Sequence, residues 1–98
     1  MPKAYVSLQD DKVMVVGDLT FATVMPLWHA SVPLLNSQAA FKFDFSKVSK
    51  CNSAGVTLLL AWIKLAKSTA KTIQFFHLPQ QLSSIIAVAG LSEVIRAS

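Results

Sequence analysis

The sequence predicts a small α/β domain in which helices pack on a mixed β-sheet. Segments with the apolar pattern of strands alternate along the chain with segments of helical periodicity. The predicted order is ββαβαβα, and its strand–helix–strand crossovers imply a mixed sheet. Because a chain of 98 residues makes one domain, we expect residues 1–98 to form a single unit.

The first two strands are predicted to form a hairpin. Residues 5–9 and 12–17 have strand patterns, and Asp10-Asp11 between them has the composition of a tight turn. The second strand is nearly continuously apolar, as expected near the centre of a sheet.

The first helix is predicted to be interrupted. Pro26 and Pro33 exclude one unbroken regular helix through this segment, because proline lacks the N–H that a helix interior uses. We expect a short turn over residues 21–25, capped by Thr20, and a main helix that begins at Pro26.

The centre of the chain is a strand followed by a long helix. Phe41, Phe43 and Phe45 alternate with charged residues, which is typical of a strand with one face buried. The strand is expected to end at Ser46, where a polar loop begins.

The helix after this loop is predicted over residues 54–67, which contain no proline and many good helix formers. Ser53 stands at the expected N-cap position. The apolar arc of the helix is wider than packing on a sheet requires, which indicates either deep burial or a second contact along one edge. The arc consists of Val56, Leu58, Leu59, Trp62, Ile63, Leu65 and Ala66.

The C-terminal third adds one strand and two helical segments. Residues 72–78 have a strand pattern, and Pro79 suits the first position of the next helix. Gly90 fits a left-handed C-cap, and residues 92–97 form a short final turn or helix.

The composition predicts a partner protein. Charged residues make up 14% of the chain, against about 25% in typical soluble domains. The net charge of +4 comes mainly from lysines, and Arg96 is the only arginine, so the pattern of a nucleic-acid site is missing. The lysines of the central third are Lys42, Lys47, Lys50, Lys64, Lys67 and Lys71.

The residues that enzymes use are sparse. The chain has no Gly-x-x-x-x-Gly-Lys loop to hold nucleotide phosphates, and its two histidines and one cysteine match no metal motif. A cluster of Cys51, His77 and Asp44 can be imagined at neighbouring strand ends, but a lone cysteine is ordinarily a small core residue. We therefore expect no catalytic activity, no cofactor and no metal.

The sequence also favours a cytoplasmic location. A single cysteine forms no internal disulfide, and the first residues lack the apolar core of a signal peptide. The longest uncharged stretch, residues 19–41, contains prolines and polar residues and is not expected to span a membrane. Any membrane association is then expected to depend on a partner.

Around the central junction the motifs resemble those of STAS domains. In that family a strand ending in Asp-x-Ser-x-Val leads to an Asp-Ser/Thr-x-Gly turn that opens a helix. The matching residues here are Asp44, Ser46, Val48, Asn52-Ser53-Ala54-Gly55 and Leu58-Leu59, together with Gly17-Asp18-Leu19 for an earlier Gly-x-Leu motif.

Within the family, the chain further resembles the small subunits of Mla-type phospholipid transporters, and this second resemblance is limited to three segments. It is carried by Pro26-Leu27-Trp28, by the loop at residues 45–50 and by residues 58–67. This resemblance implies a non-catalytic cytoplasmic subunit, peripheral to the inner membrane. It would bind and stabilise the ABC transporter ATPase, and through it the permease, and so maintain outer-membrane lipid asymmetry. The implied partner-binding residues are Trp28, Lys50, Asn52, Ser53, Ala54, Gly55 and Thr57.

Alternatives remain for two of these residues. Ser53 is a plain helix cap, a docking contact or, as in the anti-sigma-factor antagonists of the same family, a phosphorylation site that switches binding. Asn52 stands where those antagonists usually have Asp, a departure from the phosphorylated pattern. Trp28 is either core or interface. A further alternative is a lipid- or nucleic-acid-binding module that uses the lysines, with steep salt dependence.

Overall fold

Four strands form one mixed sheet in the order β1-β2-β3-β4. The computed structural model describes residues 4–96. β1 pairs antiparallel with β2, whereas β2–β3 and β3–β4 are parallel. The predicted α/β class and mixed sheet are therefore confirmed. The elements are β1 (Ala4–Gln9), β2 (Lys12–Leu19), α1 (Val24–Asn36), β3 (Phe41–Cys51), α2 (Ser53–Ser68), β4 (Ile73–Phe76), α3 (Gln80–Val88) and α4 (Ser92–Arg96).

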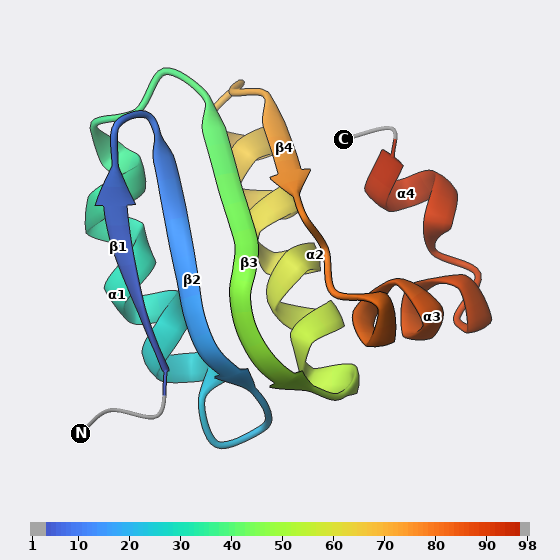
Figure 1. Cartoon of the computed structure of the whole chain (residues 1–98). Coiled ribbons are helices and arrows are strands. Elements are labelled where there is room, and N and C mark those ends of the chain that lie inside the picture. Colours follow the sequence, from blue (N-terminus) through green and yellow to red (C-terminus); the bar gives the residue numbers. More distant parts are fainter. Residues whose placement is uncertain (1–3, 97–98) are drawn as a thin grey trace.

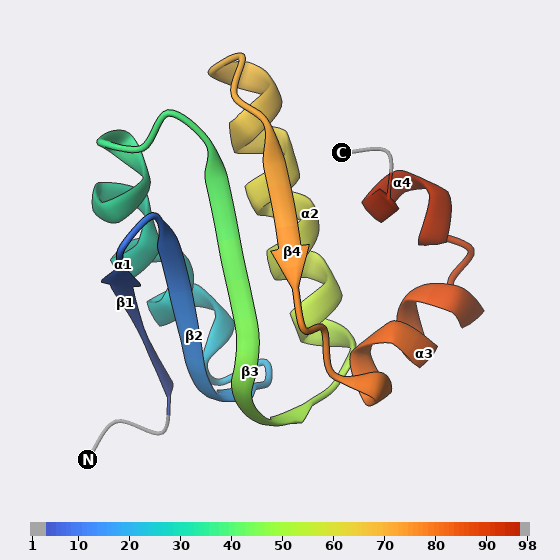
Figure 2. The same ribbon diagram turned by 45° about the horizontal axis from the view of Figure 1, so that its top comes forward.

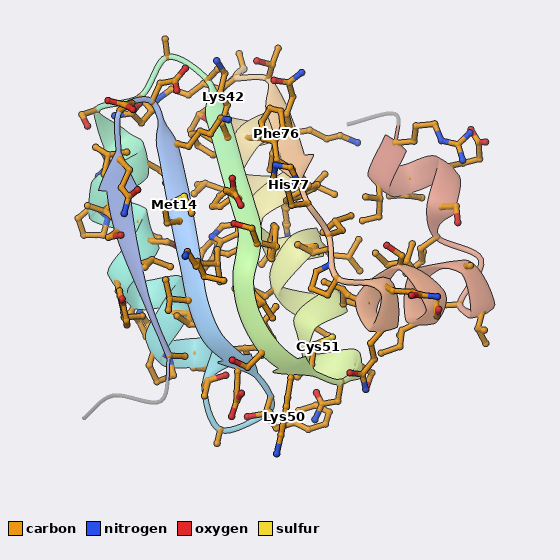
Figure 3. All side chains as sticks on the ribbon, viewed as in Figure 1. Met14, Lys42, Lys50, Cys51, Phe76 and His77 are labelled. Carbon is orange, nitrogen blue, oxygen red and sulfur yellow. The ribbon has the colours of Figure 1, made fainter. Side chains whose placement is uncertain are left out.

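The helices lie on one side of the sheet and at one of its edges. α1 and α2 cover one face, while α3 and α4 lie beyond β4 (Figures 1 and 2). Among the described residues, no helix crosses the other face, where Met14, Lys42 and Phe76 project (Figure 3). The core therefore forms between the sheet and α1 and α2, as the apolar stripes of the two helices require.

Aromatic packing fixes α2 on the sheet. The indole of Trp62 is fully buried and stacks on Phe43, with ring centroids 3.9 Å apart. Its Nε1–H donates to Oγ of Ser31 at 2.9 Å, and the Ser31 hydroxyl donates to the carbonyl of Trp28 at 2.8 Å. Since Ser31 lies on α1, this buried pair also fixes the spacing between α1 and α2.

The predicted hairpin is confirmed. Gln9 pairs with Lys12, so Asp10 and Asp11 form a two-residue turn. Asp10 has a φ of 57°, a left-handed conformation that aspartate tolerates better than most residues.

β3 is longer than predicted. The strand does not end at Ser46 but continues to Cys51, because residues 47–51 pair with the end of β2. Irregular register along this pair accommodates exposed polar residues that break the alternating pattern. The alternating pattern alone therefore predicts a strand that is shorter than β3.

α1 also begins earlier than predicted, at Val24 rather than Pro26, and one helix continues through Pro26 and Pro33 to Asn36, contrary to the predicted interruption. Thr23, not Thr20, organises this start: its hydroxyl donates to the Asp18 carbonyl at 2.7 Å and accepts from the Thr20 N–H at 2.9 Å. Pro26 lies within the first turn, where no intrahelical partner is needed for its missing N–H.

The C-terminal elements follow the prediction with small shifts. β4 covers residues 73–76, and Pro79 lies at the N-cap of α3 instead of its first turn. Gly90 adopts the expected left-handed φ of 74°, and the Leu91 N–H donates to the Ile86 carbonyl at 3.0 Å. The final segment is the short helix α4, and residue 97 of the predicted range lies outside the described residues.

Candidate functional site

The candidate site lies where β3 passes into α2. Asn52 is the N-cap of α2, and its side-chain oxygen accepts the Ala54 N–H at 2.9 Å. The prediction that Ser53 is the cap was wrong by one residue, since α2 begins at Ser53 itself. An asparagine caps as well as a serine does, and the extended backbone of Asn52 puts its side chain in the capping position.

This shift leaves the Ser53 hydroxyl free. Ser53 is exposed, and its side chain makes no hydrogen bond to any part of the chain that the structure describes. Thr57 is also exposed and lies one turn further on the same helix face, with its hydroxyl donating to the Ala54 carbonyl at 2.6 Å. The two residues therefore present one polar strip to solvent.

Ala54 and Gly55 do not belong to the exposed surface. Ala54 is fully buried, and Gly55 is buried against Leu19 of β2 and Leu82 of α3. A Cβ on Gly55 would lie 3.1 Å from Cδ1 of Leu82. The expected direct contact of these two residues with a partner is thus not supported, and they act by letting α2 approach β2 and α3 closely.

An apolar groove of about 210 Å³ adjoins Thr57, between α1 and α2. Trp28 lines this groove and also packs against the core. Part of its side chain is therefore core, and part is accessible to a partner. Met25, at the entrance, is 56% exposed. The remaining lining residues are Val24, Leu58 and Ala61.

Four groove residues were not predicted as site residues: Val24, Met25, Leu58 and Ala61. Leu58 was predicted only as part of the apolar arc of α2. The available signal was the wide apolar arc of α2, whose α1-facing edge forms this groove. A helix that begins at Pro26, as predicted, leaves Val24 and Met25 in a turn and outside any helix face, whereas both lie on α1.

Two features contribute positive charge or potential at the start of α2. Lys50 is exposed at the end of β3 and points away from the sheet near the start of α2 (Figure 3). The first turn of α2 carries no acidic residue, so the positive end of the helix dipole is not offset there. Such a surface complements an acidic partner.

The imagined cluster of Cys51, His77 and Asp44 is not formed. The Asp44 carboxylate lies 4.0 Å from Nε2 of His77, but Cys51 is buried at the far end of β3 (Figure 3). Burial raises the pKa of the Cys51 thiol, which makes it a poor nucleophile.

The Asp44 carboxyl is held in its charged form. Burial opposes ionisation, but hydrogen bonds from Ser46 and the nearby His77 and Lys12 lower the pKa of Asp44 below its ordinary value. The Ser46 N–H donates to Oδ1 at 2.8 Å. Asp44 thus stabilises the bend where β3 leaves its regular register, which is a structural role.

Within residues 4–96, no three His, Cys, Asp or Glu side chains are placed to hold a metal ion. In the same part of the chain, no helix has the length and apolar character needed to cross a membrane.

The structure is a small α/β domain with an exposed junction between β3 and the start of its central helix, α2. The family described as "Mlab, STAS domain" matches residues 6–96. The chain therefore belongs to the STAS-domain family, as the motifs around Asp44 and Gly55 predicted.

One curated protein and one solved structure are similar to this chain. The chain is 25% identical over 92 residues to the intermembrane phospholipid transport system binding protein MlaB of Haemophilus influenzae, covering 88% of each chain. Among solved structures, the anti-sigma factor antagonist SpoIIAA in its unphosphorylated form matches with a TM-score of 0.69 and 15% identity. That match covers 90% of this chain and 81% of the other. The second likeness shows the fold alone.

Proposed function

We propose that this chain is a non-catalytic subunit of an ABC-type phospholipid transporter. In this role it binds the transporter ATPase, and through it the permease, on the cytoplasmic side of the inner membrane. It thereby helps maintain outer-membrane lipid asymmetry. The observation that carries the proposal is the apolar groove beside the exposed hydroxyls of Ser53 and Thr57. The relative named for intermembrane phospholipid transport supports the choice of partner.

The surface can bind a protein in two complementary ways. The groove between Trp28 and Thr57 has room for one apolar side chain, which would be a desolvated anchor at the centre of an interface. Lys50 and the N-terminus of α2 attract acidic groups around that anchor. Ser53 then contributes a hydrogen bond at a position that its own helix does not use.

Binding at this surface would stabilise one conformation of the ATPase. A subunit that binds an assembly-competent state more tightly than other states shifts the population toward it. This needs no chemistry from the chain itself, in keeping with a domain that docks and does not catalyse. We also propose that residues 1–98 form a single domain, as expected for a chain of this length.

Affinity purification from detergent-solubilised membranes of the source organism tests the proposal. The tagged wild type should retain an ABC ATPase and a permease, identified by mass spectrometry. Ser53→Lys should lose both, because it places a long charged side chain at the proposed contact. Ser84→Lys, a matched change at an exposed serine of α3, should retain them. Recovery of both subunits with Ser53→Lys would contradict the proposal.

The second candidate is an anti-sigma-factor antagonist switched by phosphorylation. The observation that favours it is the exposed, unbonded Ser53 hydroxyl at the first position of α2, where a phosphate gains from the helix N-terminus. It predicts that Ser53→Ala is locked in its binding state, whereas the transporter proposal predicts at most weakened docking. Recovery of a serine kinase without transporter subunits would favour this candidate.

A further inference from the structure

β4 has one edge that no described strand pairs. The sheet order places β4 at the end of the sheet, with β3 on its other side. The N–H of Phe41 donates to the Thr72 carbonyl at 2.8 Å, and Phe41 is the register partner of Ile73. Because main-chain groups alternate in direction along a strand, those of Ile73 and Phe75 point away from β3.

A groove of about 470 Å³ lies along this edge, between β4 and the α3–α4 pair. Both ribbon views show α3 and α4 standing to the side of β4 (Figures 1 and 2). Leu78, Ile86 and Ile95 give the groove an apolar wall, and Ser83 and Arg96 add polar groups. The groove thus joins an apolar surface to a row of unpaired backbone donors and acceptors.

We propose that this groove binds an extended segment of a partner protein, which adds to the sheet as a further strand beside β4. Two N–H and two C=O groups, from Ile73 and Phe75, are placed to bond its backbone. Alternate side chains of the segment would contact the apolar wall, while the others remain on the open side. Arg96 is the only charged residue among the described residues that line the groove, and its guanidinium is paired with the Glu93 carboxylate at 3.4 Å, so a segment without charged side chains fits best.

A single strand fits here better than a second copy of the chain. Pairing β4 with β4 of another copy would bring its α3 and α4 against the same edge, where the first copy's α3 and α4 already stand. The groove also shares no lining residue with the groove beside Trp28. The proposal therefore does not depend on the transporter function, and the two surfaces can be tested separately.

The test begins with selection from a display library of short linear peptides on the folded wild-type chain. Selected peptides should bind Ser84→Trp as they bind wild type, and should bind Ser83→Trp roughly tenfold or more weakly. Both serines are exposed on α3, but only Ser83 lines the groove. NMR hydrogen exchange should show that peptide binding slows exchange of the Ile73 and Phe75 amides.

N-methylation of the selected peptide gives a second measure. Methyl groups on alternate residues should weaken binding by roughly tenfold or more in one register and little in the other, because only one set of N–H groups faces β4. The proposal is overturned if no peptide is selected, if Ser83→Trp binds as tightly as Ser84→Trp, or if the two amides stay unprotected. Loss of transporter subunits in the Ser53→Lys experiment has no bearing on these outcomes.

Discussion

Replacing Ser31 with alanine should destabilise the protein by breaking the buried link between α1 and α2. Trp62 and Ser31 are both fully buried, and the indole N–H has the Ser31 oxygen as its partner at 2.9 Å. Alanine removes one small oxygen, so the packing loss is minor and the unsatisfied indole N–H dominates. A buried donor left without a partner costs about 1–3 kcal/mol.

Urea unfolding of wild type and Ser31→Ala, followed by circular dichroism, measures this loss. For a domain of this size each 1 kcal/mol corresponds to about 4–8 °C in Tm, so a thermal melt should show the same effect. Ser37→Ala is the matched control, because Ser37 is an exposed serine at the end of α1 with a comparable bond to the Leu34 carbonyl. It should change stability by less than about 0.5 kcal/mol.

A double-mutant cycle with Trp62→Phe isolates the hydrogen bond from the packing. Phenylalanine removes the N–H, so adding Ser31→Ala to Trp62→Phe should cost clearly less than Ser31→Ala alone. A loss of unfolding free energy in Ser31→Ala no larger than that in Ser37→Ala, or strict additivity of Ser31→Ala and Trp62→Phe, would show that the hydrogen bond does not stabilise the fold. The link bears on function because α1 and α2 are the walls of the groove beside Trp28.

Three further predictions concern the two ends of helix α2 and the buried carboxylate of Asp44. Asn52→Ala should lower the free energy of unfolding by about 1 kcal/mol, because it removes the cap of α2. Asn52→Asp should keep the wild-type stability, because aspartate also caps helices. An equal loss in both variants would contradict the capping role. Ala70→Gly should raise stability by about 0.5–1 kcal/mol in urea titrations, since Ala70 is exposed with a φ of 56°; a loss would show that the conformation is not strained. Asp44→Asn should be less stable than wild type near neutral pH. Because the pKa of Asp44 is lowered in the folded state, its contribution is complete above the unfolded value of about 3.9 and is lost as pH falls through the folded pKa. The difference in unfolding free energy between Asp44→Asn and wild type should therefore shrink below about pH 4. A difference that does not change with pH would show that the charge of Asp44 is not its cause.

Much of the fold follows from local sequence patterns. The alternating phenylalanines of β3, the two-residue turn at Asp10 and the left-handed Gly90 each have one good local explanation, and the structure confirms them. The length of β3 does not follow, because residues 47–51 are held by pairing with β2 and not by an alternating pattern of their own.

The sequence pattern alone does not decide which residue caps α2. Asn52 and Ser53 are both good caps, and only the backbone geometry decides that Asn52 bonds the helix and leaves Ser53 free. The wide apolar arc of α2 indicates a second contact, but the groove beside Trp28 does not follow from it, because its walls come from two helices whose relative position depends on the contact between Ser31 and Trp62.

Site-specific photo-crosslinking in cells of the source organism would show whether the start of α2 and the adjoining groove bind a transporter ATPase. A benzophenone amino acid would replace Thr57 at the groove and, as the matched control, Ser84 on α3. We expect a crosslink from position 57 to an ABC ATPase and none to that protein from position 84. A crosslink to the ATPase from position 84 alone, or a crosslink from position 57 to a kinase, would contradict it.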